Sequence, residues 1–154
     1  MEYYIVAGII LAVILFILFL IKFRKSRYRY QARESFFSRN ELKFYKELKK
    51  IAPAFHCVIF SKVRLADIIE PKKHDSTWQA HFNKICSKHV DFVLFDEKIN
   101  APKLVIELDD RSHDRADRQK RDFFVDKAFH QSGIPILHTR SSDRLKEQIQ
   151  KALS

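Results

Sequence analysis

The chain has 154 residues and a formal net charge of +10 at pH 7, from 29 Lys and Arg against 19 Asp and Glu. This length leaves room for one ordinary domain and a short anchor, but not for two domains. Only two Gly and four Pro argue against a loop-rich all-β architecture and against long disordered linkers. The positive charge predicts an anionic partner, either nucleic acid or a lipid surface.

An apolar stretch over residues 3–21 opens the chain. It reads YYIVAGIILAVILFILFLI and contains no charged side chain. At ~1.5 Å per residue a helix of this length spans about 28 Å, close to the ~30 Å of a bilayer's hydrocarbon core. A cleavable signal peptide would have a shorter apolar region, a basic start and a small-residue cleavage site. We therefore expect a transmembrane helix over 3–21, with Tyr3 and Tyr4 at one membrane interface.

A basic linker follows over residues 22–37. Its cations predict a cytoplasmic side by the positive-inside rule, and hence a single-pass protein with its N-terminus outside. Contact with anionic headgroups through Tyr3–Ile21 and this flank is the simpler interpretation of the charge, and nucleic-acid binding is the alternative. The isolated Cys57 and Cys86 fit a reduced cytosolic domain. The cations of the linker are Lys22, Arg24, Lys25, Arg27, Arg29 and Arg33.

Residues 38–154 predict one domain in which helices and strands alternate. Apolar residues at helical spacing predict the helices, and short apolar runs predict the strands. Gly and Pro mark boundaries between them. Helices are expected over 38–53, 78–89 (with Trp78, Phe82, Ile85 and His89 on one face), 114–132 and 142–153. Strands are expected over 56–61, 90–95, 103–108 and 134–139, with extended or turning chain over 63–69 and a polar loop over 71–76. This order predicts an α/β domain with a mixed sheet flanked by helices.

Acidic residues mark the two central predicted strands. Alternation along a strand projects Glu107 and Asp109 to the same side. If the strands over 90–95 and 103–108 form a hairpin centred on Ile99, residues whose numbers sum to 198 face each other, and Asp91 lies opposite Glu107. Opposed carboxylates need a shared proton, a basic partner or a cation. Oxygen ligands at this spacing suit Mg²⁺ or Mn²⁺, and the alternative is simple ion pairing with Lys88, Lys103 or Arg111.

These residues carry a resemblance. The run KHVDFVL over 88–94 together with VIELDDRSH over 105–113 is similar to a bacterial family, domain-of-unknown-function family 2726 (DUF2726). Asp91, Glu107-x-Asp109 and His113 also resemble the PD-(D/E)XK restriction-endonuclease-like superfamily, near the branch of very-short-patch-repair endonucleases. The likeness covers roughly 38–140, and the bacterial family implies that the membrane is a bacterial inner membrane. It implies a restriction-endonuclease-like mixed sheet flanked by helices and metal-dependent phosphodiester hydrolysis on DNA or RNA, with no nucleotide cofactor.

The resemblance also assigns roles to individual residues. Asp91 and Glu107 would be metal ligands, and Glu41 would match an acid on the first helix that completes the site. Glu41 has a second interpretation, because Ser38-x-x-Glu41 is also a capping box. His113 would activate water or protonate the leaving group, and a simply solvated loop histidine is the alternative.

One position departs from the superfamily pattern. The third motif residue, usually Lys, is Asp109 here, which can bind metal or act as a base but cannot balance the charge of the transition state. Lys88, three residues before Asp91, is one candidate for the missing cation. Without such a cation the domain would bind nucleic acid, or serve as an interaction module, without cutting. Expected contacts to nucleic-acid phosphates come from the helix over 114–132, through Arg115, Arg118 and Arg121, although interleaved acids also fit a solvated, ion-paired face.

Overall fold

The structure is a computed structural model that describes the backbone of residues 1–25, 30–109 and 116–154. Side chains are described over the same ranges except 23–25 and 116–122. The chain divides into two compact units, Met1–Phe36 and Phe37–Ser154. The expected roles of Arg24, Lys25, Arg27 and Arg29 in the linker lie outside the described side chains.

The first unit contains helix α1 (Glu2–Lys25). Its Glu2–Lys22 portion is long and apolar enough to cross a membrane. The side chains of this portion are exposed along its length. A helix that is apolar on every side has no polar face to turn toward water, which is typical of a membrane-spanning segment.

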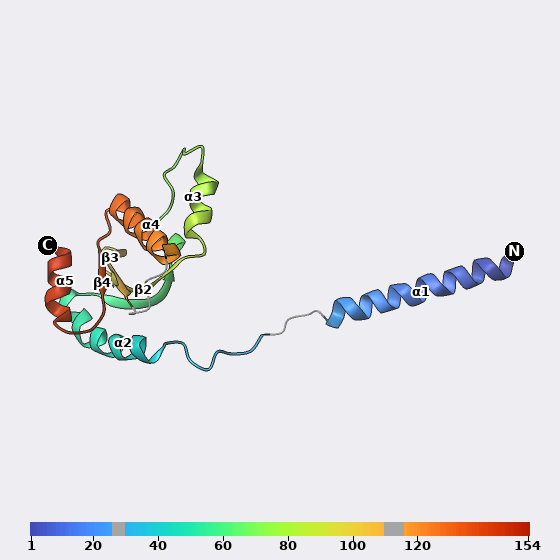
Figure 1. Ribbon diagram of the computed structural model, residues 1–154, viewed down its shortest axis with the longest axis horizontal. Helices are drawn as coiled ribbons and strands as arrows, with labels where there is room; N and C mark the ends of the chain where they lie inside the picture. The colour runs from blue at the N-terminus through green and yellow to red at the C-terminus, as the bar shows by residue number, and fades with distance from the viewer. Residues whose placement is uncertain (26–29, 110–115) are drawn as a thin grey trace. The chain divides into compact units, whose positions relative to one another are not determined.

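The second unit is built on a four-stranded mixed sheet with the strand order β1-β2-β3-β4 (Figure 1). β1 pairs antiparallel with β2, β2 antiparallel with β3, and β3 parallel with β4. The predicted mixed sheet is therefore confirmed, with β2 and β3 at its centre. The strand bounds are β1 (Val58–Arg64), β2 (His89–Asp96), β3 (Ala101–Leu108) and β4 (Ile136–Thr139).

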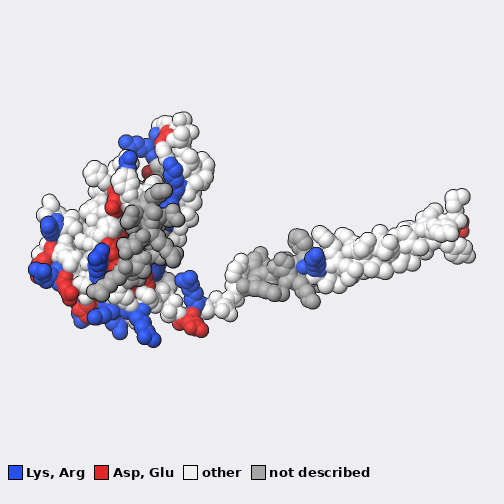
Figure 2. Space-filling model, in the orientation of Figure 1, with Lys and Arg blue, Asp and Glu red and all other residues white. Residues whose placement is uncertain are grey.

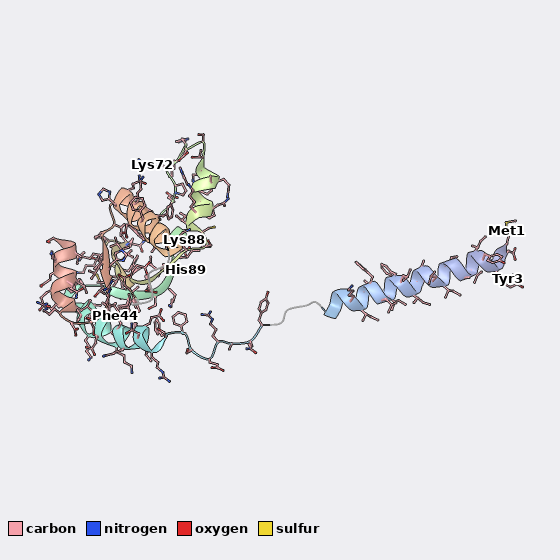
Figure 3. All side chains as sticks on the ribbon, in the orientation of Figure 1. Met1, Tyr3, Phe44, Lys72, Lys88 and His89 are labelled. Carbon is pink, nitrogen blue, oxygen red and sulfur yellow. The ribbon has the colours of Figure 1, made fainter. Side chains whose placement is uncertain are left out.

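Helices cover both faces of this sheet, and each layer has its own apolar core. Helices α2 (Arg39–Ile51) and α5 (Leu145–Leu153) contribute Phe44, Leu48, Leu145 and Ile149 to the first core, with Phe92 from β2 (Figure 3 labels Phe44). Helices α3 (Trp78–Ile85) and α4 (Ala116–Ser132) belong to the second core, which contains Ile85, Val125 and Phe129. Short 3-10 turns, η1 (Ala52–Phe55) and η2 (Leu65–Asp67), follow α2 and β1. The predicted order of helices and strands is confirmed.

The hairpin of β2 and β3 has the predicted register in the part away from its turn. Phe92 pairs with Ile106 and Leu94 with Leu104, so the paired numbers sum to 198. A shift between Leu94 and Phe95 changes the register near the turn, where Phe95 meets Pro102. Because proline has no N–H to donate, it does not fit a regular ladder at this point.

Some element boundaries differ from the sequence prediction. Helix α3 ends at Ile85, and His89 begins β2 instead of continuing the helix, because its backbone pairs with Arg64 of β1. Tertiary pairing here outweighs a helical spacing of apolar residues. The predicted stop after α4 is confirmed: Gly133 has a φ of 74°, and the N–H of Ile134 donates to the carbonyl of Phe129 at 3.2 Å.

Candidate functional site

The regular pairing of β2 with β3 ends beside Asp91. Phe92 and Ile106 form the outermost pair of this ladder. Further along β3, the backbone N–H of Leu108 donates to Oδ2 of Asp91 at 3.0 Å. The carboxylate thus replaces a strand carbonyl as the acceptor for a buried N–H. Continuing the register by one residue puts Glu107 across from Asp91.

Lys62 of β1 brings a cation to the same place. Its neighbours Ser61 and Val63 both pair with β2, while Lys62 itself has a left-handed backbone with φ of 56°. Its ammonium donates a hydrogen bond to Oε1 of Glu41 and lies 3.7 Å from Oδ1 of Asp91. A left-handed conformation costs a non-glycine residue about 1–2 kcal/mol. The interactions of the ammonium with the two acids offset that cost.

Glu41 forms the capping box considered from the sequence, and its other carboxylate oxygen contacts Lys62. Its Oε2 accepts the N–H of Ser38 at 2.7 Å, and its own N–H donates to Oγ of Ser38 at 3.2 Å, so the predicted capping box at the start of α2 is confirmed. Its Oε1 is turned to Lys62. Burial raises the pKa of Glu41, but hydrogen bonds from Lys62 and Ser38 outweigh it and leave the pKa below its usual value. The side chain is therefore ionised at neutral pH.

Glu41, Lys62 and Asp91 form what we call the acid–lysine cluster. Their side chains are 16%, 33% and 23% exposed, so water reaches the group without fully screening its charges. In the described part of the chain, no three or more His, Cys, Asp or Glu side chains are arranged to hold a metal ion. Carboxylate oxygens are suitable Mg²⁺ ligands, but here the ammonium of Lys62 already lies against both acids. A divalent ion would compete with it.

Glu107 is adjacent to the acid–lysine cluster in the sheet. It is half-buried and pairs with His138 of β4. Because side chains alternate along a strand, Glu107 is on the same face of the sheet as Val105, which packs in the core with α4. Side-chain contacts join Glu41 and Asp91 through Lys62, and the strand that carries Glu107 lies next to that of Asp91.

Asp109 lies at a second polar group, on the side of α4. Nδ1 of His138 is 3.5 Å from Oδ1 of Asp109, and Nε2 of His138 is 2.7 Å from Oδ1 of Asp126. Burial lowers the pKa of His138, but the two aspartates outweigh it and raise the pKa above its usual value. The sequence analysis missed His138, because its place beside Glu107 comes from the parallel pairing of two strands separated by a helix.

This histidine gives the domain a predictable dependence on pH. A pKa that is higher in the folded than in the unfolded state stabilises the fold while His138 is protonated. This stabilisation is complete at a pH below the unfolded-state pKa of about 6.5. It is lost as the pH rises through the folded-state pKa. Asp126→Asn should therefore destabilise the protein by about 0.5–1 kcal/mol at acid pH, a magnitude typical of a partly exposed ion pair, and by less at alkaline pH. Urea unfolding followed by the fluorescence of Trp78 measures this, and an equal loss at both pH values would contradict it.

Lys88 lies away from the acid–lysine cluster. Its ammonium donates to the carbonyl of Lys84 at 2.6 Å and lies 5.1 Å from the ring centroid of Phe124. In the structure Lys62, which the sequence analysis did not consider, is the lysine beside Asp91. The remaining predicted site residues are outside the described side chains, namely His113, Arg115, Arg118 and Arg121.

The fold and the site define a small mixed α/β domain that follows an apolar helix, with an acid–lysine cluster formed by residues of α2, β1 and β2. The sequence over residues 33–153 matches the family described as Protein of unknown function (DUF2726), and the chain belongs to this family. The match includes every element from α2 to α5, so Glu41, Lys62 and Asp91 all lie within the matched region. No curated protein and no solved structure matches the chain.

Proposed function

We propose that this chain is a membrane-anchored nuclease of the restriction-endonuclease-like class, which hydrolyses phosphodiester bonds of DNA or RNA with Mg²⁺ or Mn²⁺. The observation that carries the proposal is the convergence of acids from separate segments. The first helix of the domain supplies Glu41 and β2 supplies Asp91, which Lys62 joins, and β3 carries Glu107 one residue beyond the last regular pair of the hairpin. A mixed sheet between helical layers is the scaffold that the resemblance implies.

The proposed site assigns each residue a task. Asp91, Glu107 and Glu41 would hold the divalent ion, which when bound would activate water and offset charge on the scissile phosphate. Lys62 would supply the cation that is missing at position 109. Because it comes from β1, it can balance charge at the phosphate without belonging to the strand motif. Asp109 would act through His138, whose protonation it favours.

The membrane anchor is the second part of the proposal. The apolar α1 would cross the inner membrane of a bacterium with its N-terminus outside. The cations that follow it from Lys22 onward would stay with the domain in the cytoplasm, by the positive-inside rule. Anionic headgroups would be their partners.

A non-catalytic nucleic-acid-binding or interaction domain is the second candidate. It is favoured by the position of Lys62, whose ammonium bonds Glu41 and lies near Asp91, where a metal would otherwise bind. In this case the acid–lysine cluster only joins α2 to β1 and β2, and phosphate contacts come from other cations of the surface.

The dependence of cleavage on a divalent metal tests the proposed function. The full chain in detergent should cut labelled single- or double-stranded DNA or RNA when Mg²⁺ or Mn²⁺ is present, and removing the metal with EDTA should stop it. Binding without cutting, with an affinity that falls steeply as salt rises, would support the second candidate. Cleavage that persists in EDTA would exclude the metal-dependent mechanism.

A further inference from the structure

Helix α2 exposes a basic stripe on the side opposite its buried residues. Phe44 and Leu48 pack in the core, whereas the cations recur at helical spacing on the outer side. Figure 2 shows Lys and Arg gathered along the edge of the domain that α2 forms. Leu42, 42% exposed, lies within the same stripe. The basic stripe consists of Arg39, Lys43, Lys46, Lys49 and Lys50.

Little negative charge balances this stripe. Of the two acids of α2, Glu41 is turned to Lys62, and Glu47 forms an ion pair with Lys50 at 2.7 Å. Among the described residues, Lys43, Lys46 and Lys49 form no ion pair with an acid. The ion pairs that involve α2 are Glu41 with Lys62 and Glu47 with Lys50. Helix α5, in the same layer, adds the exposed Lys146 and Lys151.

The stripe is also close to the apolar helix along the chain. Thirteen residues, 26–38, separate α1 from α2. At ~3.5 Å per residue they span at most about 45 Å, whatever their conformation. A tether of this length keeps the stripe at a high effective concentration near the surface in which α1 is inserted.

We propose that the basic stripe of α2 docks the domain on anionic phospholipid headgroups of the membrane that holds α1. This rests on the anchor in the proposed function but not on catalysis. A row of cations along about 16 Å of straight helix fits a flat anionic surface. Leu42 gives the row an apolar side chain at the depth of the headgroups, as in helices that lie on membranes.

The experiment compares the full chain in nanodiscs of phosphatidylcholine with and without phosphatidylglycerol. An amine-reactive reagent followed by mass spectrometry reports the labelling rate of each lysine. We expect rates at Lys43, Lys46 and Lys49 to fall several-fold in the anionic nanodiscs and to recover at high salt, where the Debye length shrinks from ~10 Å to ~3 Å. Unchanged rates in both nanodiscs would overturn the proposal.

Exposed lysines of the other layer provide the matched control. Lys72, Lys73 and Lys84 should label equally in both nanodiscs (Figure 3 labels Lys72). Replacing these three with glutamate should leave the protection of the stripe intact. Replacing Lys43, Lys46 and Lys49 with glutamate should abolish the slower labelling of Lys50 and Lys146 in the anionic nanodiscs. If Lys50 and Lys146 remain protected in this variant, the assignment of the docking surface to α2 is overturned.

Further outcomes separate docking from anchoring and from nucleic-acid binding. A chain that carbonate extracts from the bilayer has no anchor, which overturns both the anchor and the docking. A chain that remains inserted but shows no protection overturns the docking alone. Protection that requires an added oligonucleotide would identify nucleic acid as the occupant and overturn the lipid proposal.

Discussion

Replacing Asp91 with asparagine is expected to lower metal-dependent cleavage by about 10³-fold, because loss of a charged ligand removes several kcal/mol of stabilisation from the transition state. The fold should survive this change. The amide oxygen of asparagine can still accept the N–H of Leu108, which Asp91 accepts at 3.0 Å. Asp91→Ala removes that acceptor as well and should cost about 1–3 kcal/mol of unfolding free energy. Initial rates of cleavage and urea unfolding measure the two effects separately.

Asp96 provides the matched control on the same strand. It is a buried aspartate that accepts the N–H of Lys98 at 3.0 Å and lies 3.5 Å from Lys103, outside the acid–lysine cluster. Asp96→Asn should lower stability without lowering cleavage beyond the loss of folded protein. If Asp91→Asn cuts like the wild type, or both variants lose activity equally, Asp91 is not a metal ligand.

The parts of the fold that depend on local patterns could be predicted from the sequence. The hairpin register follows from two apolar strands around a short turn, and the structure confirms it from Phe92 to Leu94. The capping box of Ser38 and Glu41 and the stop at Gly133 are likewise set by neighbouring residues.

The composition of the site could not be predicted in the same way, because distant segments form it. Lys62 reaches Glu41 only through the packing of α2 on the sheet and a left-handed backbone in β1, and no local spacing indicates either. Lys88 was the candidate cation because it is close to Asp91 in sequence. In the structure the ammonium of Lys88 instead contacts the carbonyl of Lys84 and the ring of Phe124. Proximity along the chain is a poor guide to charge pairing at strand ends.

Replacing Lys62 with methionine should separate its contribution to stability from its proposed contribution to cleavage. Methionine keeps much of the side-chain volume but leaves the carboxylates of Glu41 and Asp91 without their cation, which should cost about 1–3 kcal/mol of unfolding free energy at neutral pH. The cost should shrink as pH falls through the folded pKa of Glu41, because the depressed pKa stabilises the fold only while that acid is ionised.

Metal binding and cleavage by Lys62→Met then decide whether Lys62 serves the reaction or only stabilises the fold. If Lys62 serves the reaction, cleavage falls by about 10²-fold while Mn²⁺, freed from a competing ammonium, binds more tightly in calorimetry. Lys103→Met is the matched control: the two lysines are 33% and 34% exposed, and Lys103 lies 3.5 Å from Asp96. It should alter neither readout. If Lys62→Met cleaves at the wild-type rate, Lys62 is only a structural counter-ion of the two acids. A cation needed at the phosphate could not be removed without slowing the reaction.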